Sequence, residues 1–313
     1  MAQQPESAGD GATGDPQIDA LLATAQKAGA EERWGDAETA LQSAVELFPA
    51  GDGGAGEVRI RLQLAILQAS TGRVDAGLAA IDDCVAAAER LGDATLGAEV
   101  HGAAANLALA AGRPGAAVAR FRAGLEIAGS LADLRWQVQL RTGLGMALYQ
   151  SGEAESSVEV LQENAHAARA IPDPVTAGMA LETVSDALAS VDRATDALTV
   201  ALEALAKFEQ GKAGPFMIQA SIGISNLYLV VGQPEKAAQY TTQAVTLGRT
   251  FGGPSGESSV LLGLAVTANQ RGDAASARQF LEQGGACLRD AGLPEPPEMA
   301  GMADQLNGSK PRD

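Results

Sequence analysis

The chain has 313 residues, of which 46% are hydrophobic but only 4% aromatic, and its 22 Lys and Arg against 39 Asp and Glu give a net charge of −17. This alanine-rich composition suits closely packed helices, whereas strands favour β-branched and aromatic side chains. The acidity disfavours nucleic acid and membrane surfaces as ligands, and two Cys and two His far apart in the sequence exclude a zinc finger or a disulfide-stapled fold.

The N-terminal segment, residues 1–15, is acidic and has neither the basic nor the apolar part of a signal peptide, so we expect it to be disordered. No apolar run is long enough to span a bilayer. Cys84 and Cys287 have no obvious disulfide partner, which fits a reducing compartment. These features predict a cytoplasmic protein without membrane insertion.

A period of 40 residues runs through the chain, marked by a glycine or a substitute for one. The seven marker positions are Glu32, Gly72, Gly112, Gly152, Asp192, Gly232 and Gly272. Small residues recur seven positions before the markers (Ala25, Ala65, Ala105, Gly145, Ser185, Ser225, Ala265) and five positions after them (Ala37, Gly77, Ala117, Ser157, Ala197, Ala237, Ala277). A side chain that faces a neighbouring helix backbone must be small, so this spacing predicts repeated close helix contacts.

Each repeat is predicted to be a helix, a short turn and a second helix. Residues 57–70 have the apolar spacing of a helix, and Gly72 would end it. A second apolar stripe follows over residues 74–85, and later repeats begin their second helix at Pro114 and Pro234, where proline suits the first turn. Longer connectors are expected at residues 48–56, 171–174, 211–215 and 252–256.

Such hairpins must stack to bury their apolar faces. The sequence therefore predicts an all-α fold, an α-solenoid of about seven stacked antiparallel hairpins over residues 16–291. In the last segment, residues 292–313, Met299, Met302 and Leu306 have helical spacing and are expected to cap the final hairpin.

These residues resemble the tetratricopeptide repeat superfamily. The run from Trp34-Gly35-Asp36-Ala37 to Phe48-Pro49 looks like the second helix of that repeat, and Ala105-Asn106-Leu107 and Ser225-Asn226-Leu227-Tyr228 look like a step in its first helix. The period of 40 is similar to the long-helix branch of the superfamily, found in adaptors and in sensor domains. The resemblance implies a right-handed superhelix and says little about function.

The resemblance also implies a binding groove along the first helix of each hairpin. Carried over residue by residue, the expected partner-binding positions are Arg59, Leu62, Ile66, Glu99, Asn106, Gln139, Thr142, Met146, Glu182, Asp186, Gln219, Ile222 and Asn226. Glu182 and Asp186 stand four apart on one helix face and form an acidic patch that would favour a partner with Lys or Arg. Only Arg59 is basic, which disfavours the carboxylate clamp that some members of the superfamily use.

No catalytic, metal or cofactor set is predicted. Residues 51–56 satisfy G-x-G-x-x-G, but they follow a helix and a proline rather than a strand, which favours an inter-repeat loop. His101 and His166 lie in different repeats and are interpreted as ordinary exposed or half-buried helix residues, and Cys84 as a small packing residue. The adjacent carboxylates Asp82 and Asp83 are interpreted as a solvated face.

The leading hypothesis is a non-catalytic scaffold or adaptor that binds a protein or peptide in the groove. The alternative is a regulatory sensor that binds a small ligand or a signalling peptide and changes the pitch of the superhelix. An enzyme is disfavoured because the sequence contains no nucleophile–base pair and no metal set.

Overall fold

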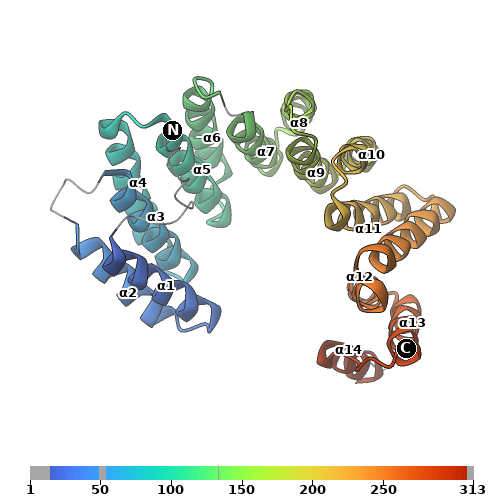
Figure 1. Cartoon of the computed structure of the whole chain (residues 1–313). Helices are drawn as coiled ribbons and strands as arrows, with labels where there is room; N and C mark the ends of the chain where they lie inside the picture. The colour runs from blue at the N-terminus through green and yellow to red at the C-terminus, as the bar shows by residue number, and fades with distance from the viewer. Residues whose placement is uncertain (1–14, 49–53, 133, 309–313) are drawn as a thin grey trace, which may run out of the picture. The chain divides into compact units, whose positions relative to one another are not determined.

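The protein, described by a computed structural model over residues 15–48, 54–132 and 134–308, contains fourteen helices and no strand within those ranges. Pairs of helices follow one another as hairpins along the chain (Figure 1). The helices are α1 (Pro16–Ala30), α2 (Trp34–Glu46), α3 (Gly54–Ser70), α4 (Val74–Leu91), α5 (Ala94–Ala110), α6 (Pro114–Ala128), α7 (Leu134–Gln150), α8 (Ala154–Arg169), α9 (Pro174–Ser190), α10 (Ala194–Gln210), α11 (Gly214–Val230), α12 (Pro234–Gln270), α13 (Ala274–Asp290) and α14 (Pro297–Gly308). The predicted all-α solenoid of hairpins is confirmed.

Helix α12 joins two hairpins. Its backbone is helical on both sides of Gly253, which has φ 59° and ψ −152°, and Pro254 begins the second part. Residues 234–252 are thus the second helix of one hairpin, and residues 254–270 are the first helix of the next. The sequence predicted a longer connector over residues 252–256, but a single glycine suffices because only it leaves the helical conformation.

The seven markers all end a first helix in the same way. Each has a positive φ, including the non-glycine residues Glu32 (φ 57°) and Asp192 (φ 61°). The residue after each marker donates its N–H to the carbonyl oxygen five residues earlier, at 2.8–2.9 Å. This is the Schellman motif, which needs a left-handed residue. The prediction that Asp192 fills a glycine position is confirmed.

Replacing Asp192 with glycine is expected to leave the free energy of unfolding unchanged or to raise it by up to about 1 kcal/mol, because glycine removes the Cβ penalty of the left-handed conformation. Urea denaturation followed by circular dichroism measures this difference. A decrease of more than about 1 kcal/mol would show that the Asp192 side chain has a second task.

The small residues before and after each marker bring the two helices of a hairpin together. All fourteen of them are buried. Two hydrogen bonds repeat at the 40-residue spacing, because Ser185 Oγ donates to the Ala197 carbonyl oxygen and Ser225 Oγ to that of Ala237, each at 2.9 Å. The 40-residue period therefore fixes one recurrent contact.

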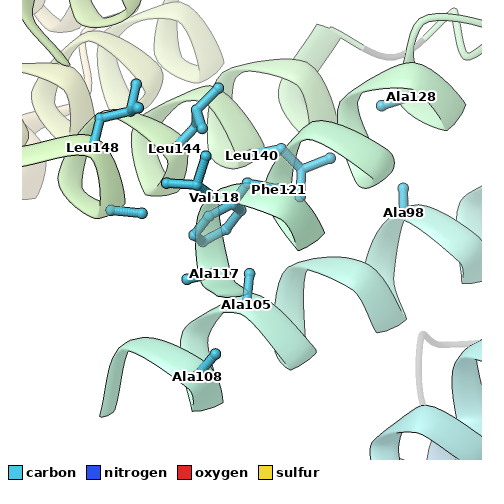
Figure 2. Packing of buried hydrophobic residues seen from close by; sticks show 11 residues of the cluster. Ala98, Ala105, Ala108, Ala117, Val118, Phe121, Ala128, Leu140, Leu144 and Leu148 are labelled. Carbon is cyan, nitrogen blue, oxygen red and sulfur yellow. The ribbon is translucent and has the colours of Figure 1, made fainter. Parts of the chain in front are cut away.

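Large side chains fill the core between consecutive hairpins. Phe121 of α6 is 2% exposed and packs with Leu140, Leu144 and Leu148 of α7 and with alanines of α5 (Figure 2). Gly143 of α7 leaves room for the aromatic ring, since a Cβ there would lie 2.2 Å from Phe121 Cζ.

The C-terminal helix α14 covers the last hairpin. Its Met299, Met302 and Leu306 are buried in one cluster with Leu281 and Leu288 of α13. These are the three residues expected from the sequence for a C-terminal cap, which stays a prediction. The predicted disordered segment lies outside the described residues except for Asp15, whose carboxylate accepts the N–H of Gln17 at 2.8 Å and caps α1.

The helices form two units, residues 1–160 and 161–313, divided within α8. Within each unit consecutive first helices pack against each other, α3 with α5 and α5 with α7 in the first, α9 with α11 in the second. The second helices α2, α4 and α6 do not pack on one another in this way. The first helices therefore lie on the inner side of each unit. We call their exposed surface the first-helix face.

On the side of the second helices, ion pairs join one hairpin to the next. They join Glu38 to Arg73, Asp75 to Arg113, Asp82 to Arg120 and Arg169 to Glu203, each bridging one second helix or its N-terminus to the next. Pairs at exposed positions contribute only about 0.2–1 kcal/mol each. Asp82, interpreted with Asp83 as a solvated face, is exposed and pairs with Arg120 there.

Candidate functional site

In the first unit, predicted groove residues of successive first helices lie side by side. Arg59 Nε of α3 is 2.8 Å from Glu99 Oε2 of α5, although the two residues are 40 apart in the sequence. Equivalent positions of neighbouring repeats are thus within contact distance on the first-helix face. The other accessible positions of this unit are exposed Ile66, Asn106 and Gln139 and partly buried Met146.

Two predicted groove residues offer no surface to a partner. Leu62 is 5% exposed and belongs to the core between α3, α4 and α5. Thr142 is 7% exposed, and its hydroxyl donates to the Val138 carbonyl oxygen of the same helix at 2.9 Å.

In the second unit, two carboxylates of α9 stand on the first-helix face without a cationic partner. Glu182 is half-buried and Asp186 is exposed, and neither makes an ion pair or hydrogen bond among the described residues. Burial, and then the neighbouring Asp186, raise the pKa of Glu182 to about 7. Partial desolvation also raises the pKa of Asp186.

The raised pKa of Glu182 makes stability depend on pH. The folded chain holds this proton more tightly than the unfolded chain, so the stabilisation is present below about pH 4.5 and is lost as the pH rises through about 7. Glu182→Gln is therefore expected to stabilise the protein by about 1–2 kcal/mol at pH 8 and hardly at all at pH 4. Urea denaturation at both pH values measures this, and a pH-independent difference would contradict it.

A cavity of about 440 Å³ opens between α11 and the second part of α12. Its wall is largely apolar and carries no charged side chain. The lining residues are Pro215, Ile218, Gln219, Ile222, Gly248, Phe251, Gly252, Gly256, Ser259, Val260, Gly263 and Thr267. Its size falls within the range of ligand pockets, about 300–1,000 Å³. Of the predicted groove residues, Gln219 and Ile222 line it.

The 40-residue register shows where the cavity comes from. In the preceding repeat Phe208 and Phe216 stack with ring centroids 5.2 Å apart. The equivalent positions 40 residues later are Gly248 and Gly256, whose backbones touch, since a Cβ on Gly256 would lie 2.4 Å from the Gly248 carbonyl oxygen. The cavity thus lies where one repeat lacks the aromatic pair. The cavity was not predicted from the sequence, although Gly248 and Gly256 stand out in the 40-residue register.

The remaining predicted residue of this unit, Asn226, is partly buried near the end of α11. Its Oδ1 accepts a hydrogen bond from Arg271 Nη1 at 2.5 Å. The face therefore carries a cation at this end and the two uncompensated carboxylates on α9. Gln219 remains exposed.

His101 and Cys84, the side chains with the greatest chemical reactivity named above, are packed in the interior. His101 is 5% exposed, more buried than predicted, and burial and then Arg120 lower its pKa. Cys84 is 2% exposed, and burial raises the pKa of its thiol to about 11, as expected for a packing residue. Of the G-x-G-x-x-G segment, residues 51–53 lie outside the described residues and Gly54 begins α3.

No family model matches the chain, and no curated protein matches it. Several solved structures do match the chain. Apo RapI aligns with a TM-score of 0.54 at 12% identity, over 93% of this chain and 81% of RapI. BtubC from P. vanneervenii aligns with a TM-score of 0.52 at 16% identity, over 76% of this chain and 91% of BtubC.

A third similar structure is the Signal Transduction ATPase with Numerous Domains (STAND) protein with a tetratricopeptide repeat sensor from Pyrococcus horikoshii. It aligns with a TM-score of 0.51 at 14% identity, over 96% of this chain and 45% of that protein. These likenesses establish the fold, a tetratricopeptide-repeat-like α-solenoid. Of the helices described, none combines the length and apolar character that a membrane span needs.

Proposed function

We propose that the chain is a non-catalytic scaffold that binds a protein or peptide on its first-helix face. The observation that carries this proposal is that the first-helix face of the second unit holds two carboxylates, Glu182 and Asp186, that have no partner among the described residues, together with an open cavity. A surface that leaves a half-buried carboxylate without a partner is costly for folding, which favours a role in binding.

The charge of this face favours a partner with Lys or Arg. Glu182 and Asp186 would attract such a segment, and steering by exposed charges speeds association at low salt. The net charge of −17 acts in the same direction at long range.

Affinity capture from the native cell tests this function. The bait is the full chain, compared with the double variant Glu182→Gln/Asp186→Asn. The control is Glu159→Gln/Glu163→Gln, a second exposed pair four residues apart, on the second helix α8 and without a partner among the described residues. We expect the wild type and the control to capture the same protein and the double variant to capture several-fold less. Equal capture by all three would contradict the proposal.

A second candidate is a regulatory sensor for a small ligand or signalling peptide. The size of the cavity favours it, as does the likeness to a protein whose repeat is described as a sensor. X-ray scattering discriminates the two functions, because a sensor changes its dimensions when its ligand binds and a scaffold does not.

A further inference from the structure

We propose that the cavity between α11 and α12 receives one apolar side chain of a bound peptide, whose neighbouring Lys or Arg lies against Glu182 and Asp186. This inference rests on the proposed function and adds to it the chemistry of the partner. It also places the apolar anchor of the peptide at the repeat that contains α11 and α12.

The cavity suits an uncharged side chain that enters from solvent. No Asp, Glu, Lys or Arg lines it, and Ile218, Ile222 and Val260 form its apolar wall. Half of its lining residues are exposed, among them Phe251 at 54%. An open mouth favours a side chain that projects from a polypeptide over a ligand that is enclosed on all sides. A buried apolar anchor in such a pocket typically contributes much of the binding energy of a peptide.

The carboxylates stand on α9, the first helix that packs against α11 and so against one wall of the cavity. Glu182 occupies the position on α9 that Ile222 occupies on α11, 40 residues later, and the two helices pack against each other. In the first unit, Arg59 and Glu99 stand at equivalent positions of consecutive first helices, and Arg59 Nε lies 2.8 Å from Glu99 Oε2. Side chains at such positions can therefore reach one another. From this register we infer that Glu182 and Asp186 flank the cavity on its α9 side, whereas Arg271 at Asn226 stands at the C-terminal end of α11. A basic residue next to the apolar anchor complements this arrangement.

The chain offers a matched pair of substitutions that separates the cavity from the rest of the face. Gly263 lines the cavity, is exposed and helical, and a Cβ there meets no atom within 4 Å. Gly223 occupies the equivalent position one repeat earlier, is equally open and does not line the cavity. Gly263→Leu places an apolar side chain at the wall of the cavity, and Gly223→Leu places the same side chain on the neighbouring helix.

The probe is a phage-displayed library of random nonapeptides, selected on the full wild-type chain alone. We expect enrichment of Leu, Ile, Met or Phe with Lys or Arg within a few residues, and depletion of Asp and Glu. For the best peptide, we expect Gly263→Leu to weaken binding at least about 10-fold and Gly223→Leu less than about 2-fold. Glu182→Gln/Asp186→Asn should weaken it about 5-fold and reduce its salt dependence, unlike Glu159→Gln/Glu163→Gln.

Circular dichroism verifies that each variant folds, and Phe251→Ala, which removes an exposed cavity wall, supplies a second test that should also weaken binding. Selected peptides that bind Gly263→Leu as tightly as the wild type, or that carry no basic residue, would overturn the inference. So would a cavity that binds only small molecules. If cellular capture still depends on Glu182 and Asp186 but not on Gly263, the cavity assignment fails and the proposed function stands.

Discussion

Replacing Phe121 with alanine is expected to lower the free energy of unfolding of the first unit by about 3–5 kcal/mol. Phe121 is almost fully buried and is the large side chain in a cluster built mostly of alanine and leucine. Because Trp34 and Trp136 both lie in this unit, fluorescence during urea denaturation reports on it selectively. The expected result is a large shift of the fluorescence transition to lower urea.

A double-mutant cycle with Gly143 tests the reason for this effect. In the wild type, Gly143→Ala should destabilise, because its Cβ would lie 2.2 Å from the ring of Phe121. In the Phe121→Ala background the same change should stabilise by up to about 1 kcal/mol through helix propensity. Additive effects in the two backgrounds would show that the ring does not rest on Gly143.

Gly256→Ala is expected to destabilise the second unit by about 2–3 kcal/mol. The added Cβ would lie 2.4 Å from the Gly248 carbonyl oxygen, so the backbone itself must shift. The matched control is Gly263→Ala in the same helix, where nothing lies within 4 Å and helix propensity predicts a gain of up to about 1 kcal/mol. Hydrogen exchange of α12 measures both, and equal effects of the two alanines would contradict the close approach.

The repeat itself could be predicted from the sequence because it depends on local and periodic features. A left-handed residue ends each first helix, and this requirement places a glycine, or Glu32 and Asp192 in its stead, every 40 residues. The hairpin contact likewise requires small residues at fixed distances from each marker. The solenoid and its seven hairpins follow from these positions.

The candidate site could be predicted only in part, because accessibility depends on packing between repeats. Leu62 and Thr142 share the register of accessible groove residues, yet their helices bury them. The cavity depends on what is absent, the aromatic pair replaced by Gly248 and Gly256, and on the kink at Gly253. A search for residues that carry chemistry does not detect such missing side chains.

Site-specific photocrosslinking in the native cell tests most directly whether the first-helix face is the binding surface. Four exposed glutamines are matched for this purpose, Gln139 and Gln219 on first helices and Gln162 and Gln283 on second helices. With benzoylphenylalanine at each position in turn, we predict a discrete protein adduct from Gln139 or Gln219 and none from Gln162 and Gln283. Adducts from the second-helix positions alone would contradict the assignment of the binding surface.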